Sequence, residues 1–98
     1  MHVGALHVDL RIRGMRSLKE KRRVVKRIIA DVGTPHPIAV AEVDHQDLWQ
    51  RAALGIAAVS GSPGQIDRML ASIMRELEQR TDVEVLGSGR FYLDEEDR

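Results

Sequence analysis

Apolar and polar residues alternate near the start of the chain. Between residues 6 and 12 every second side chain is apolar, and His7, Asp9 and Arg11 lie between them. Successive side chains of a strand point to opposite faces, so this pattern predicts a half-buried β-strand.

Other apolar segments predict three further strands. Two are expected over residues 38–43 and 52–60, on either side of a polar turn. A last strand is expected to begin over residues 83–86, to bend at residues 87–89, where two glycines lie, and to resume as far as residue 93.

Two segments have the period of a helix. The first begins after Ser17, which forms an S-x-x-E capping box with Glu20, and ends before residues 33–37, which contain Gly and Pro. The second begins after Ser62, with Pro63 in its first turn. Its apolar side chains form one stripe at helical spacing: Ile66, Met69, Leu70, Ile73, Met74 and Leu77.

The predicted order of elements is β-α-β-β-α-β. This order is the ferredoxin-like split β-α-β plan of the α+β class. Right-handed crossovers then place both helices on one face of an antiparallel four-stranded sheet. We expect a single domain over residues 1–93, followed by an acidic tail over residues 94–98.

The net charge of the 98 residues is zero, but the charges are segregated. Residues 10–30 contain nine Lys and Arg against one Glu, a net charge of +8, and the rest of the chain carries −8. Such asymmetry favours a partner for the basic segment, often a nucleic acid.

Composition also limits the possible chemistry and cellular location of the protein. The chain has no Cys, which excludes disulfides and thiolate metal sites. Polar residues interrupt the N-terminus, so no signal peptide is predicted, and the longest apolar stretch has eight residues against the ~20 that span a bilayer. We expect a cytoplasmic protein without a membrane partner.

The first predicted helix carries the basic candidate site. Five cations cover an arc of about 140° opposite the apolar stripe. They are a solvated face or the contact for an anionic partner, and the second interpretation predicts RNA binding. With one cation of the preceding loop, the candidate RNA-binding residues are Arg16, Lys19, Arg22, Arg23, Lys26 and Arg27.

A polar segment, EVDHQDLWQR at residues 42–51, lies between the second and third predicted strands. Its Asp, Glu and His side chains are potential metal ligands, but on an extended strand neighbouring side chains point to opposite faces. We therefore predict no metal and a structural polar cluster. Lys21 falls within the apolar stripe, so it either reaches solvent or meets a carboxylate of this segment. The predicted cluster is Lys21, Glu42, Asp44, His45 and Asp47.

The predicted fold places this segment beside the start of the first helix. We expect at least one of its three carboxylates to pair with a cation there, among Arg13, Arg16, Lys19 and Lys21. Trp49 is expected to cover the edge of the core, and its alternative role is a stacking platform for a base or an anchor for a protein.

The third predicted strand exposes small side chains on its outer face. RNA-recognition motifs carry stacking aromatic residues on their central strands, and this chain has only three aromatic residues, none on those strands. Small residues permit close approach of another surface, so this face is a candidate homodimer or partner interface. Its members are Ala53, Gly55, Ala57 and Val59.

A third alternative is a small phosphate-site enzyme. Arg13, Arg16 and Ser17 precede the first helix, whose free N–H groups attract anions. Ferredoxin-like acylphosphatases use an arginine-bearing loop at this place together with an asparagine that positions water. This chain has no Asn, so we expect no catalytic residues and no cofactor.

The segments SLKEKRRVVK at residues 17–26 and VAEVDHQDLWQRAALGIAAVS at residues 40–60 resemble the YlxP-like family of small bacterial proteins. The resemblance covers nearly all of the first ninety residues and implies a ferredoxin-like fold. Genes of that family often lie among genes for translation initiation and ribosome maturation, which implies a role near RNA or the ribosome. The resemblance carries over no catalytic residues. We therefore expect a non-enzymatic domain that binds RNA or a ribosomal surface through the first helix.

Overall fold

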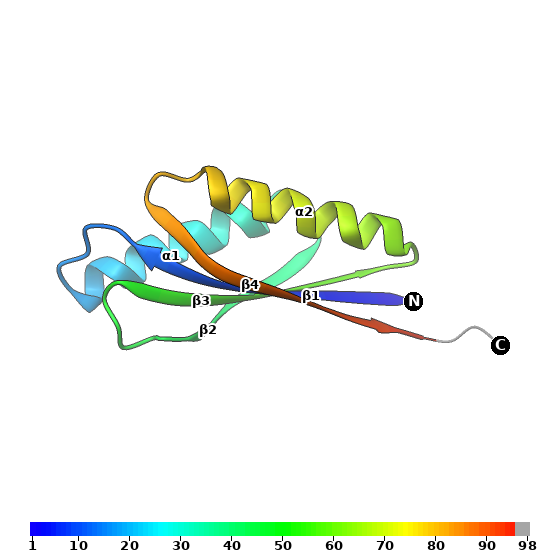
Figure 1. Cartoon of the computed structure of the whole chain (residues 1–98), viewed down its shortest axis with the longest axis horizontal. Helices are drawn as coiled ribbons and strands as arrows, with labels where there is room; N and C mark the ends of the chain where they lie inside the picture. Colours follow the sequence, from blue (N-terminus) through cyan, green and yellow to red (C-terminus); the bar gives the residue numbers. More distant parts are fainter. Residues whose placement is uncertain (96–98) are drawn as a thin grey trace.

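The computed structural model describes residues 1–95. Three elements form its first half: β1 (His2–Ile12), α1 (Leu18–Gly33) and β2 (Ile38–Asp44). The second half contains β3 (Arg51–Ser60), α2 (Pro63–Gln79) and β4 (Val83–Asp94). The predicted order of elements and the ferredoxin-like α+β fold are confirmed (Figure 1).

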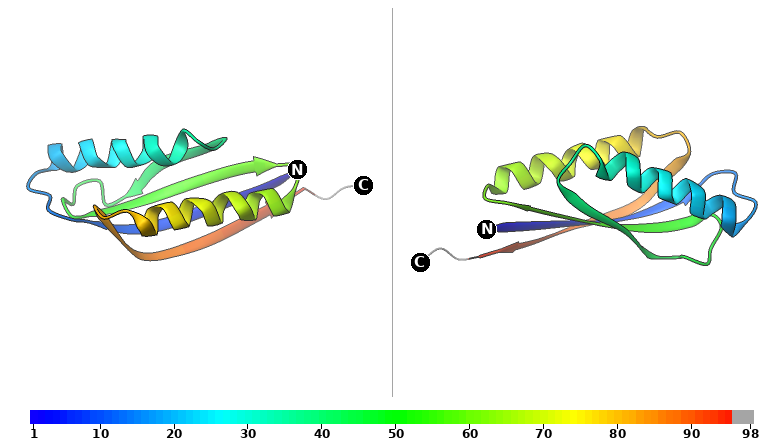
Figure 2. Two further views of the ribbon diagram at one scale, coloured as in Figure 1. Left: turned by 90° about the horizontal axis from the view of Figure 1, so that it is seen from above. Right: turned by 180° about the vertical axis from the view of Figure 1, so that it is seen from behind.

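The four strands form one antiparallel sheet in the order β2-β3-β1-β4. The strands β3 and β1 are therefore central. Both helices lie on the same side of this sheet, and the other face has no covering layer (Figure 2). The sheet thus has one face in the core and one open face.

The core forms where the apolar stripes of the helices meet the inner face of the sheet. The inner residues of β1, from Leu6 to Ile12, are buried as the alternation predicts. Gly4 lies on the same face under α2, where a Cβ atom would clash with Ile66 Cγ2. A glycine at this position permits the close approach of helix and strand.

Both predicted helix starts are confirmed. The Ser17 hydroxyl accepts a hydrogen bond from the Glu20 N–H at 3.1 Å. The Ser62 hydroxyl accepts one from the Gln65 N–H at 3.4 Å, and Pro63 occupies the first helical position. These bonds satisfy N–H groups that have no partner inside the helix.

Strands β1 and β4 depart from prediction at their ends. Strand β1 begins at His2 rather than at residue 6, and its early start gives Leu93 and Asp94 of β4 the partners Val3 and His2. Asp94, assigned from the sequence to the acidic tail, therefore belongs to β4. Residues 96–98 of that tail lie outside the described residues.

The last strand is continuous where a bend was expected. Asp9 pairs with Gly87 and Leu10 pairs with Val85, so Leu86 is an extra residue in β4. This is a β-bulge, which increases the local twist without ending the strand.

Candidate nucleic-acid interface

The basic side chains of α1 gather on its outer side. A hollow of about 320 Å³ is lined by four of them: Lys19, Arg22, Arg23 and Lys26. Within residues 1–95, none of the four lies within salt-bridge distance of a carboxylate, although Lys19 is followed by Glu20. Like charges one helical turn apart repel one another by a few tenths of a kcal/mol, so this row gains from an anionic partner.

The remaining two candidates flank this row. Arg27 lies near enough to Asp82 for its charge to help lower the pKa of that carboxyl group. Arg16 lies in the loop before α1, and its backbone N–H donates to Glu20 Oε2 at 3.3 Å. The structure therefore groups four of the six candidates around one hollow, and neither Arg16 nor Arg27 lines it.

Lys21 is the exception on this basic helix. Its side chain is 0 % exposed, and its Nζ donates to Glu42 Oε2 at 2.7 Å. The same Nζ donates to the carbonyl oxygens of His45 at 2.8 Å and Gln46 at 3.4 Å. The three N–H groups of an ammonium thus have three acceptors. The expected pair between this segment and the helix start is present, and it joins α1 to the β2–β3 turn.

The turn itself has an unusual backbone conformation at His45. Its φ is +62°, in the left-handed region that few residues other than glycine adopt. Asp44 Oδ1 accepts the His45 N–H at 2.7 Å, a local bond that compensates for this conformation. The His45 carbonyl then accepts from Lys21.

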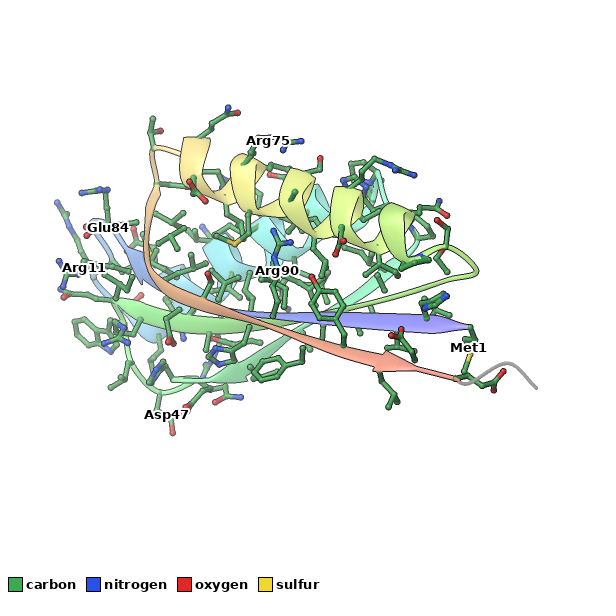
Figure 3. All side chains as sticks on the ribbon, turned by 45° about the vertical axis from the view of Figure 1, so that its right-hand side comes forward. Met1, Arg11, Asp47, Arg75, Glu84 and Arg90 are labelled. Atoms are coloured by element: carbon green, nitrogen blue, oxygen red, sulfur yellow. The ribbon has the colours of Figure 1, made fainter. Side chains whose placement is uncertain are left out.

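The other two carboxylates of the predicted cluster do not contact the cations of the helix start. Asp44 is 68 % exposed in its side chain, and its one ion-pair partner within residues 1–95 is His45, at 3.9 Å. Asp47 is exposed, and Figure 3 shows it pointing away from the sheet. Glu42 is the carboxylate that pairs with Lys21 because it lies on the inner face of β2, opposite Leu54. The side of α1 that carries Lys21 faces this position.

His45 also reaches across the open face of the sheet. Its Nε2 lies 3.6 Å from Asp9 Oδ1, on β1. Because β3 lies between β2 and β1, this contact crosses above Ala53, which pairs with both Asp9 and Asp44. Within residues 1–95, no three His, Asp or Glu side chains gather closely enough to hold a metal ion.

The predicted interface on the open face of the sheet is wrong at Ala53, which is buried. It is 0 % exposed, because His45 and Asp9 lie over it. Gly55 is partly covered by Val43, since a Cβ on Gly55 would come within 2.8 Å of Val43 Cγ1. Ala57 and Val59 are exposed as expected.

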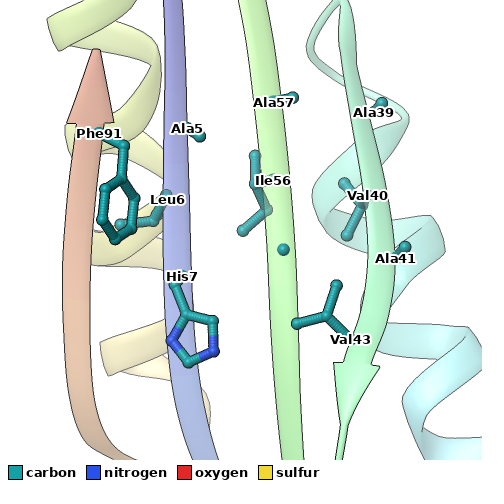
Figure 4. Close-up of a pocket in the computed structure, with 11 residues that line it drawn as sticks. Ala5, Leu6, His7, Ala39, Val40, Ala41, Val43, Ile56, Ala57 and Phe91 are labelled. Carbon is teal, nitrogen blue, oxygen red and sulfur yellow. The ribbon is translucent and has the colours of Figure 1, made fainter.

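The centre of the open face is a shallow apolar hollow of about 400 Å³. Phe91 on β4 and Val43 on β2 stand on its two sides, with alanines between them and His7 at one end (Figure 4). Phe91 is 62 % exposed. The bulge that makes Val43 an extra residue in β2 helps to turn it toward this hollow.

Trp49 is not part of the core, so the prediction that it covers the core edge is wrong. It is 49 % exposed and lines a hollow of about 340 Å³ with Leu48, Gln50 and Arg51. The Gln50 carbonyl accepts the Ile12 N–H at 2.8 Å, which places this segment beyond the end of the strands.

The loop before α1 offers limited room for a phosphate. Arg13 lies 3.7 Å from Glu84 on β4, and Arg11 lies 3.9 Å from the same carboxylate. Figure 3 shows Arg11 and Glu84 together at the end of the molecule opposite Met1. Glu20 already accepts the Arg16 N–H. These contacts reduce the support for an acylphosphatase-like site.

Sequence reasoning missed one charged network. Arg80, just after α2, donates to both carboxylate oxygens of Asp82, at 3.0 and 2.9 Å, and to Asp31 of α1 at 2.9 Å. The hydrogen bond from Arg80 holds the pKa of the Asp82 carboxyl below its ordinary value of 3.8. The bond to Asp82 likewise raises the pKa of the Arg80 guanidinium. The sequence signal for this network was the pair Arg80 and Asp82, which are separated by one residue.

Fold and site together define a ferredoxin-like α+β domain with one strongly basic helix and an open apolar sheet face. Residues 3–90 match the family described as "Protein of unknown function (DUF503)", and the chain belongs to this family. No helix within residues 1–95 combines the length and apolar character needed to cross a membrane.

The chain is also similar to one curated protein and to one solved structure. It is 40 % identical over 68 residues to "Uncharacterized protein YlxP" of Bacillus subtilis (strain 168), covering 69 % of this chain and 74 % of that protein. The resemblance to the YlxP-like family is thereby confirmed. Among solved structures, the chain is similar to "Structure of the REP associates tyrosine transposase bound to a REP hairpin", with a TM-score of 0.42 and 12 % identity. That alignment covers 96 % of this chain and 57 % of the transposase chain.

Proposed function

We propose that this domain binds structured RNA, without catalysis, through the outer face of α1. One observation carries the proposal. Four cations of α1 line a single hollow, and none of them has a carboxylate partner within residues 1–95. The acidic residue nearest the row on α1 is Glu20, one turn before Arg23, and its carboxylate accepts the Arg16 N–H instead.

An RNA backbone is the anionic partner that fits this row. Its phosphates repeat along an extended surface, as do cations on successive turns of a helix. Double-stranded RNA is recognised mainly through its shape and backbone, which needs no stacking aromatic residue on the sheet. The resemblance to the YlxP-like family favours ribosomal RNA or a ribosomal surface as the source of that backbone.

The proposal predicts electrostatic and weakly sequence-selective binding. If about four phosphates are neutralised, log K should fall against log salt with a slope of roughly −3 to −4. Replacing Arg22 and Arg23 by Gln should reduce the steepness of that slope by roughly 1.5 to 2 and weaken binding at low salt. Fluorescence anisotropy of a labelled RNA hairpin across a salt series measures both effects.

The matched control removes the same charge elsewhere. Arg68 and Arg75 are exposed on α2, and Figure 3 shows Arg75 on the side of that helix away from the sheet. Replacing both by Gln should give the same slope of log K against log salt, within error, as the wild-type protein. Equal losses from the two double variants would mean that net charge alone drives binding, and no affinity for RNA at low salt would refute the proposal.

Self-association is a second candidate function. The observation that favours it is the apolar hollow on the open face, with the exposed Phe91 ring standing beside it. A second copy related by a two-fold axis would bring one ring against the hollow of its partner, which is the self-complementary arrangement that a symmetric dimer needs.

A further inference from the structure

The only tryptophan of the chain lies in an exposed position that the core does not explain. Trp49 is half exposed, and Leu48 beside it is exposed to a similar degree. A large apolar surface held in solvent marks an interaction site when its neighbours define a partner. The residues that share the hollow of Trp49 are apolar Leu48, polar Gln50 and basic Arg51.

The segment that carries Trp49 is fastened to the basic helix. On one side, the Lys21 ammonium holds the carbonyls of His45 and Gln46 to the first turn of α1. On the other side, the Gln50 carbonyl holds the end of β1. Figures 1 and 2 both show the β2–β3 turn beside the start of α1.

Two arginines lie at the end of the central strands beside Trp49. Arg51 shares its hollow, and Arg11 pairs with Arg51 across the two central strands. Arg13 and Arg16 follow in the loop that leads to α1. The carboxylates at this end are Glu84, which lies near Arg11 and Arg13, and Asp47, which is exposed two residues before Trp49. An exposed indole among guanidinium groups is the composition that binds unpaired nucleotides, with the ring stacking a base and the cations contacting phosphates.

We infer that Trp49 is a stacking platform for one unpaired base of the RNA held by α1. The inference rests on the proposed function and specifies its RNA ligand, a helical stem that adjoins unpaired nucleotides. Phosphates of the stem lie along the row from Lys19 to Lys26, and the strand that leaves the stem passes over the end of the domain. The base then meets the indole beside Arg51.

The test uses the single tryptophan as its own reporter. The full chain is titrated with an RNA hairpin that has an unpaired adenosine loop, and with a blunt duplex that has the same number of phosphates. Stacking should quench Trp49 emission with the hairpin and leave it unchanged with the duplex. Trp49→Ala should weaken hairpin binding roughly 5- to 150-fold, the factor that corresponds to one stacked base, with the salt slope preserved.

The Trp49→Phe variant is the matched control, because it keeps an aromatic face and should restore most of the affinity. Hairpin binding that depends on Arg22 and Arg23 but neither changes Trp49 emission nor responds to Trp49→Ala would overturn the inference and leave the proposed function standing. Equal weakening of hairpin and duplex by Trp49→Ala would also overturn it, since that pattern indicates a structural role. No binding of either RNA at low salt would overturn both.

Discussion

A fully buried lysine decides the local structure at the start of α1. Lys21 has no exposed surface, and an ammonium without partners would be too costly to bury. Glu42 supplies the counter-charge, and the carbonyls of His45 and Gln46 accept the remaining hydrogen bonds. The pair therefore fixes the β2–β3 turn to the helix.

Removal of the counter-charge should expose this dependence. Glu42→Gln leaves the buried ammonium without a charged partner, and we expect the free energy of unfolding to fall by about 3–5 kcal/mol. Urea denaturation followed by circular dichroism measures the change. Asp47→Asn, in the same segment but exposed, should change the free energy by no more than about 0.5 kcal/mol.

A double variant separates charge from packing. Lys21→Met with Glu42→Leu removes both charges and should recover part of the loss seen with Glu42→Gln, because no buried charge is left unpaired. If Glu42→Gln is no more destabilising than Asp47→Asn, Lys21 does not depend on its counter-charge.

At the scale of elements, Arg80 connects three segments. It follows α2, bonds to Asp31 of α1 and holds both oxygens of Asp82 before β4. The helices are thus joined to each other on their polar side by one guanidinium, apart from the apolar core between them and the sheet.

This network predicts a pH dependence of stability. The folded pKa of Asp82 lies below its ordinary value of 3.8, because Arg80 stabilises the charged form. Its contribution is therefore complete above pH 3.8 and is lost as the pH falls through the lower folded value. The stability difference between the unchanged protein and Asp82→Asn should be constant near neutral pH and shrink under acid conditions.

Thermal melts across an acid pH series measure that difference. Glu78→Gln, on the exposed side of α2, is the control and should show no such narrowing. A difference that grew as the pH fell would contradict the assigned sign, since it would mean that the folded state binds protons at Asp82 more readily than the unfolded chain.

For the whole molecule, the two proposed surfaces lie on different sides. The basic row lies on α1, and the apolar hollow lies on the face of the sheet that the helices leave open (Figures 2 and 4). Because they do not share residues, a change in one should leave the other intact.

Ala57→Arg tests the open face. The side chain of residue 57 points away from the helices, so the fold should persist while a charge enters the hollow. If the protein self-associates through this face, sedimentation velocity should show the dimer lost, with RNA affinity not reduced. Gln79→Arg, exposed at the end of α2, adds the same charge and should leave association unchanged. A monomer at high concentration before any substitution would exclude self-association.

The sequence by itself determined the element order and the faces of the elements. Alternation over residues 6–12 and the stripe from Ile66 to Leu77 each follow from a fixed period, so they required no knowledge of distant residues. The capping serines are equally local. The same reasoning identified Lys21 as a cation within an apolar stripe, which either reaches solvent or meets a carboxylate of residues 42–47.

Only the tertiary structure decided which groups meet. Register placed Glu42 on the inner face of β2 and left Asp44 and Asp47 outside, and the contact between His45 and Asp9 buried Ala53. The start of β3 at Arg51 left Trp49 in the turn and half exposed, and the ends of both helices brought Arg80 to Asp31. Period determines the face of a side chain, but contact between distant segments depends on register, bulges and the points where elements end.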